Sequence, residues 1–114
     1  MNDRELLELA ARAAGFTGYG FFLGDDGIDV SDETGTRFAW NPLTDDGDAL
    51  RLAVKRGLVV TPDRENQRTL ISNKAGHEYC AIYWDKLGEM AATRLAITEA
   101  AAAAEIGKSM GVGE

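Results

Sequence analysis

The pattern of hydrophobic and polar positions predicts three helices. Residues 3–14 place leucine and alanine side chains at helical spacing opposite charged ones, and Asn2 with Glu5 matches a capping box. A second helical pattern runs from a cap at residue 44 or 45 to residue 56, with acidic side chains at its start and basic ones at its end. The third runs over about 88–110. Small residues form a ridge along it: Ala92, Ala96, Ala100, Ala103 and Gly107.

Six short segments have the alternation or the aromatic and β-branched content of strands. They are residues 16–23, 28–31, 36–40, 58–61, 68–72 and 77–84. Asp26-Gly27 suits a tight hairpin turn, and Pro62 is expected to cut the fourth segment short. The order α-βββ-α-βββ-α predicts an α+β layered sandwich, in which helices pack on a mainly antiparallel sheet. We expect one domain over residues 1–114, with a flexible tail at about 111–114.

Charge is divided unevenly along the chain. The formal net charge is −7, and residues 24–48 account for all of it, whereas residues 51–74 are net basic. Overall acidity argues against general nucleic-acid binding, which requires neutralisation of phosphates. No apolar run approaches the ~20 residues of a membrane helix. The first residues do not resemble a signal peptide, and Cys80 is the only cysteine, so we expect a reducing cytoplasm.

Candidate catalytic chemistry is sparse. His77 and Cys80 lie three apart on one predicted strand, so their side chains are expected on opposite faces. The pair Gly18 and Gly20 falls within a predicted strand instead of opening a helix, which fails the context of a dinucleotide-binding loop. A magnesium site built with Asp29 or Asp32 stays open but has no supporting pattern. We therefore predict no enzyme activity, no metal and no cofactor.

Two groups of residues suggest binding instead. The first combines basic and aromatic side chains, which suit phosphate contacts and ring stacking: Arg64, Arg68, Lys74, His77, Tyr79, Tyr83 and Trp40. The second is acidic and suits a basic protein partner: Asp25, Asp26, Asp45, Asp46 and Asp48. Each group also has a plain structural explanation, namely core packing and solubility for the first and turns and helix starts for the second.

Two segments carry a resemblance to a known family. They are Trp40-Asn41-Pro42-Leu43-Thr44-Asp45-Asp46-Gly47-Asp48-Ala49-Leu50-Arg51-Leu52-Ala53-Val54, and residues 91–100 followed by 104–110. In order and spacing they resemble the phage ABA sandwich domain family. Leu95 departs from the pattern, where a second arginine often follows Thr-Arg. The resemblance implies a layered α/β sandwich and a viral origin, and it brings no catalytic residues.

These observations lead to three functional hypotheses. The first is a non-catalytic phage or prophage accessory protein that counteracts host defence by sequestering a small anionic nucleotide in the bacterial cytoplasm. It predicts a homo-oligomer, with the alanine ridge as a possible seam. The alternative is an acidic inhibitor or DNA mimic directed at a host protein, and a second alternative is a phage structural or assembly factor.

Overall fold

The computed structural model describes residues 2–21 and 27–109. The elements follow the predicted order: α1 (Asp3–Ala13), β1 (Gly18–Phe21), β2 (Ile28–Ser31), β3 (Arg37–Trp40), α2 (Asp46–Arg56), β4 (Val59–Asp63), β5 (Arg68–Ser72), β6 (Glu78–Tyr83) and α3 (Glu89–Ser109). The predicted α+β class and the order of elements are therefore confirmed. The predicted tail and most of the Asp26-Gly27 turn lie outside the described residues.

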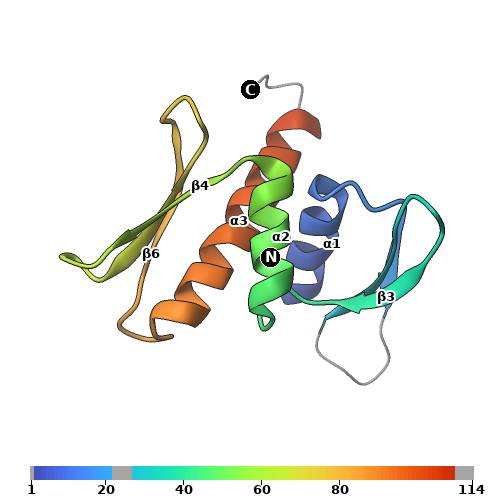
Figure 1. Cartoon of the computed structure of the whole chain (residues 1–114), viewed down its shortest axis with the longest axis horizontal. Helices are drawn as coiled ribbons and strands as arrows, with labels where there is room; N and C mark the ends of the chain where they lie inside the picture. Colours follow the sequence, from blue (N-terminus) through green and yellow to red (C-terminus); the bar gives the residue numbers. More distant parts are fainter. Residues whose placement is uncertain (1, 22–26, 110–114) are drawn as a thin grey trace.

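The strands form two separate sheets, whereas we expected one. Strands β1-β2-β3 make an antiparallel N-terminal sheet, and β4-β5-β6 make an antiparallel C-terminal sheet. The three helices lie side by side between the two sheets, so the layers are sheet, helices, sheet (Figure 1). Each sheet is a meander of consecutive strands, and α2 separates the two meanders along the chain. Strands β3 and β4 lie in different sheets because the helical layer stands between them in space (Figure 1).

Local sequence signals fix the helix ends. Asn2 and Glu5 form the predicted capping box of α1. Asp45 caps α2, because its side chain accepts a hydrogen bond from the backbone N–H of Asp48. Gly57 ends α2 in the left-handed conformation, at φ 64°. These caps set the points at which the chain enters and leaves the central helical layer.

The alanine ridge of α3 lies inside the molecule. Ala92, Ala96 and Ala100 have 0% exposed surface, because α3 packs against α1, α2 and the C-terminal sheet. Small side chains let these elements approach closely, with Leu7 of α1 and Ile71 of β5 in the same core. The suggestion that this ridge is an oligomer seam is therefore wrong for these three residues. None of the described helices is long and apolar enough to cross a membrane.

Two details of the C-terminal sheet differ from the sequence prediction. Strand β4 does not stop before Pro62 but continues to Asp63, with Pro62 opposite Thr69. Proline is tolerated there because β4 is an edge strand, which has only one hydrogen-bonded neighbour. In β6 the register shifts between Cys80 and Glu78, so Tyr79 lies in a bulge. The bulge breaks the alternation of faces expected for this strand.

Candidate functional site

The structure separates the predicted basic and aromatic residues into three places. Arg64, Arg68 and Tyr83 lie at the end of the C-terminal sheet that carries the β4–β5 turn. Lys74, His77 and Tyr79 belong to the β5–β6 turn and its flank, at the opposite end of the same sheet. Trp40 is 3% exposed and lies in the core beside the N-terminal sheet. The seven residues therefore do not form one site.

The two arginines at the β4–β5 end already have partners within the fold. Arg64 pairs with Glu89 at 3.4 Å and lies over the Trp84 ring. The Arg68 Nε donates to Asp63 at 3.0 Å. Hydrogen bonds from Asn66 and Arg68 lower the pKa of Asp63, so the carboxylate stays ionised beside its donors. These contacts account for the positions of both arginines, and no ligand is needed to explain them.

The other end of the sheet contains a hollow that we call the basic pocket. It has a volume of about 430 Å³ and lies between the C-terminal end of α2 and the β5–β6 turn. Its lining includes the side chains of Lys55, Arg56, Lys74, Tyr79, Asn73 and Val54. Among the described residues, no acidic side chain lines it. Lys74 and Tyr79 were predicted as ligand residues, and His77 belongs to the adjoining turn.

The cations of the basic pocket lack partners in the described part of the chain. Lys55, Arg56 and Lys74 form no ion pair with a described residue. The Nε atom of Arg56 is buried and has no hydrogen-bond acceptor. A buried donor of this kind costs free energy unless something accepts from it. The lining of the hollow therefore offers positive charge to an anion.

Local structure positions these groups. Lys55 and Arg56 occupy the last turn of α2, where positive charge complements the helix dipole. The side-chain oxygen of Asn73 accepts from the backbone N–H groups of Ala75 and His77 and so shapes the turn that carries Lys74. Sequence analysis assigned Lys55 and Arg56 to the helix dipole alone. Only the tertiary structure places Lys74 on the same hollow as these two residues.

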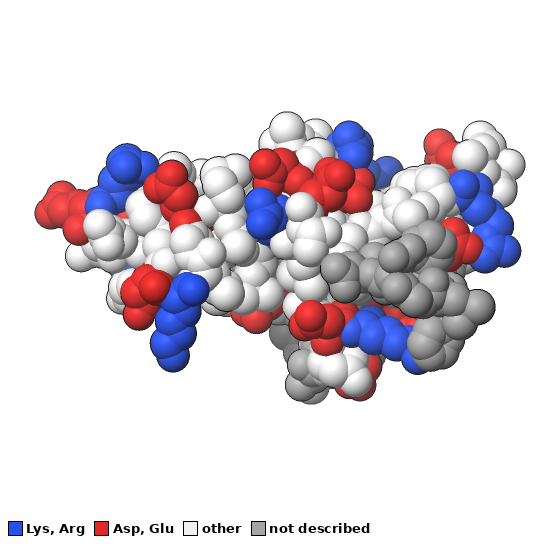
Figure 2. Space-filling view, turned by 90° about the horizontal axis from the view of Figure 1, so that it is seen from below, with Lys and Arg blue, Asp and Glu red and all other residues white. Residues whose placement is uncertain are grey.

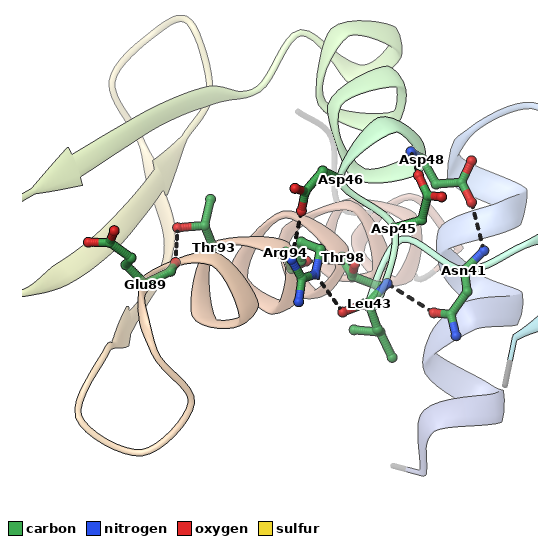
Figure 3. A network of polar contacts seen from close by, with 9 residues as sticks. All are labelled: Asn41, Leu43, Asp45, Asp46, Asp48, Glu89, Thr93, Arg94 and Thr98. Carbon is green, nitrogen blue, oxygen red and sulfur yellow. Dashed lines mark hydrogen bonds and ion pairs between the residues drawn. The ribbon is translucent and has the colours of Figure 1, made fainter.

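The acidic residues at the start of α2 are engaged inside the fold (Figure 3). Asp45 is the helix cap, and the Oδ1 of Asp46 accepts from Arg94 Nη1 at 2.6 Å. Asp48 is 9% exposed and accepts from the backbone N–H of Asn41 and from Arg51. Asp25 and Asp26, the other members of the predicted acidic surface, lie outside the described residues.

Arg94 joins the two segments that carry the family resemblance. Besides its ion pair with Asp46, its Nε donates to the backbone oxygen of Leu43 at 2.8 Å (Figure 3). The start of α3 is thereby tied to the loop before α2. We call this arrangement the Arg94 clamp, formed by Arg94, Leu43 and Asp46. The clamp gives residues of both resembling segments a structural role that requires no ligand.

Thr93 ties the same part of α3 to the C-terminal sheet. Its hydroxyl donates to the backbone oxygen of Glu89, so the Thr69 hydroxyl donates to Thr93 at 2.6 Å. Thr69 in turn accepts from Trp84 Nε1 at 2.9 Å. Every polar group of this chain of bonds is therefore satisfied. Thr93 and Arg94 together tie α3 to the C-terminal sheet and to the start of α2.

The remaining reactive side chains do not form a catalytic pair. Cys80 donates its Sγ–H to the backbone oxygen of Ala96, and burial raises the pKa of this thiol to about 11. The thiol is therefore protonated at neutral pH and a poor nucleophile. His77 is exposed in the β5–β6 turn. On the face drawn in Figure 2, acidic and basic side chains lie close together, with no broad area of one sign.

Comparisons with known proteins contribute no functional information. No protein-family model, curated protein or solved structure matches this chain. The resemblance to the phage ABA sandwich family therefore stays a prediction. The basic pocket and the chemistry of its lining residues are therefore the basis for a proposed function.

Proposed function

We propose that this protein is a non-catalytic binding protein that sequesters a small anionic nucleotide, with the phosphates in the basic pocket. The observation that carries the proposal is that Lys55, Arg56 and Lys74 line one hollow, with no acidic residue lining it among the described residues. Arg56, whose Nε is buried without an acceptor among the described residues, is one of these lining residues.

The pocket suits phosphate in both charge and size. A guanidinium group offers several N–H donors in a fixed plane, which match phosphate oxygens, and lysine adds a compact positive charge. The volume of about 430 Å³ lies within the range of small-molecule sites. Because the whole chain carries −7, an anion is attracted only near this local patch. Binding is therefore expected to weaken as the salt concentration rises.

We propose that the protein binds the nucleotide without converting it. The described lining of the basic pocket contains no carboxylate, thiol or imidazole that could act as a general base. A protein that holds a signalling nucleotide without converting it lowers the free concentration of that signal. We propose further that this protein is a phage accessory protein that counteracts host defence in the bacterial cytoplasm.

The first test is calorimetric titration with inorganic pyrophosphate at low salt. We expect the wild-type protein to bind it, and the double variant Arg56→Gln with Lys74→Gln to bind at least tenfold more weakly, since charged hydrogen bonds are lost. Arg64→Gln with Lys86→Gln is the matched control, because it also removes two positive charges but lies outside the basic pocket. If wild type does not bind, or if the double variant binds equally well, the proposal is wrong.

A second test asks what the protein carries from the cell. Native mass spectrometry of protein expressed in bacteria would be followed by denaturation and analysis of released small molecules. A nucleotide-sized mass that disappears on unfolding, and that is absent from the double variant, would support sequestration in this pocket. The same mass in the double variant would move the site elsewhere.

A further inference from the structure

A second hollow lies on the other side of Lys55 from the basic pocket. We call it the aromatic pocket. It has a volume of about 260 Å³ and is enclosed by the end of α1, the C-terminal half of α2 and the N-terminal sheet. Three aromatic side chains line it, Phe16, Phe38 and Trp40, together with the charged side chains of Arg51, Lys55, Asp32 and Glu33. Neither the Arg94 clamp nor the basic pocket explains this combination.

The aromatic side chains form a fixed wall with one accessible ring. Phe16 meets Phe38 and Trp40 edge to face, with ring centroids 5.6 Å and 5.2 Å apart. Trp40 is 3% exposed, whereas Phe38 is 38% exposed. The packing of Phe16 and Trp40 therefore holds Phe38 in place while leaving part of its ring uncovered. A planar aromatic ligand can stack on such a surface.

The charges around the aromatic pocket differ from those of the basic pocket. The carboxylate of Asp32 accepts hydrogen bonds from the Thr34 hydroxyl and from the backbone N–H groups of Thr34 and Thr36. These bonds, led by that of the Thr34 hydroxyl, lower the pKa of Asp32, so the group stays anionic. Glu33 beside it is exposed. Two carboxylates repel phosphate but can accept from the N–H groups of a ring.

Lys55 connects the two pockets. It lines both hollows, and its aliphatic chain passes beside Gly15 at the rim of the aromatic pocket. Arg51, one turn earlier on α2, lines the aromatic pocket but is already paired with Asp48 at 2.7 Å. Lys55 has no ion pair with a described residue. It is therefore the cation available to a ligand that extends from one hollow to the other.

We infer that the aromatic pocket is the base subsite of the same ligand whose phosphates occupy the basic pocket. The ligand class is then a nucleotide whose base carries an amino group: the ring stacks on Phe38, the amino group donates to Glu33, and Lys55 bridges to the phosphate. This inference rests on the proposed function, because it assumes that the basic pocket holds the phosphates.

The experiment compares three probes: adenosine 5′-monophosphate, ribose 5-phosphate and inorganic pyrophosphate. We expect wild type to bind the nucleotide at least tenfold more tightly than ribose 5-phosphate, because stacking of one base on an aromatic side chain is a substantial gain. Phe38→Ala should remove this difference and leave pyrophosphate binding unchanged. Leu50→Ala is the matched control, since it truncates an exposed apolar side chain that lies outside both hollows.

A second variant keeps the inference testable if Phe38→Ala disturbs the fold. Glu33→Gln changes an exposed side chain, and we expect it to reduce the preference of the protein for adenosine 5′-monophosphate over purine riboside 5′-monophosphate, whose base has neither the amino group nor an N1–H donor. Equal affinity of wild type for the nucleotide and for ribose 5-phosphate, with pyrophosphate still bound, overturns this inference alone. Failure to bind pyrophosphate overturns the proposed function as well.

Discussion

The two ends of α2 carry opposite charges and are used in opposite ways. At the N-terminal end Asp45 caps the helix, Asp46 pairs with Arg94, and Asp48 is almost buried against Asn41 and Arg51. At the C-terminal end Lys55 and Arg56 face a hollow and have no acidic partner among the described residues.

This difference shows how little charge order alone reveals about function. Acids at the start of a helix and bases at its end both complement the dipole, so the sequence explains both ends equally well. The tertiary structure gives the acidic end partners from α3 and from the loop before α2. It gives the basic end another lysine, Lys74, and an open volume. The candidate site is distinguished by positive charges that have no acidic partner among the described residues.

The largest expected effect comes from breaking the Arg94 clamp. Arg94→Ala removes the donors to Leu43 and Asp46, so we expect the free energy of unfolding to fall by about 2–3 kcal/mol. Urea denaturation followed by circular dichroism measures this change. Arg64→Ala is the control, because its exposed ion pair is expected to contribute at most about 0.5 kcal/mol. Equal stability of the two variants would contradict the structural role of the acidic end.

A smaller loss is expected from Thr93→Val, which keeps the shape of the side chain but removes its hydroxyl. The Thr69 hydroxyl then loses its acceptor in a position with no solvent exposure, at a cost of about 1–2 kcal/mol. Thr61→Val on the exposed edge strand β4 should change stability by less than about 0.5 kcal/mol. Similar denaturation midpoints for the two variants would show that the Thr93 bonds contribute nothing.

The smallest expected effect is at the basic end. Without added ligand, Arg56→Gln with Lys74→Gln should change the free energy of unfolding by less than about 1 kcal/mol, because no ion pair is lost and removal of the buried donor of Arg56 offsets the weaker interaction with the helix dipole. In saturating pyrophosphate, the melting temperature of wild type should rise and that of the double variant should not. A large loss of stability without ligand would mean that these cations support the fold, and the comparison between the two ends would fail.

Sequence patterns predicted the helices and strands but not the set of residues that lines the basic pocket. The capping box at Asn2, the left-handed Gly57 and the order of strands follow from local chemistry, and the structure agrees with each. The expectation that Pro62 ends β4 is wrong, since an edge strand tolerates proline. The residues from Arg64 to Tyr83 are close in sequence, but an antiparallel meander of three strands places its two turns at opposite ends of the sheet.

The sequence by itself determined the order of the helices and strands and the caps of α1 and α2, because caps, turns and periodicity act between residues a few positions apart. It also placed acidic and basic charge at the two ends of α2. Only the tertiary structure decided that the strands form two sheets, that Ala92, Ala96 and Ala100 are buried, and that Lys55, Arg56 and Lys74 line one hollow. Those outcomes depend on packing between elements distant in the chain, which local patterns do not specify.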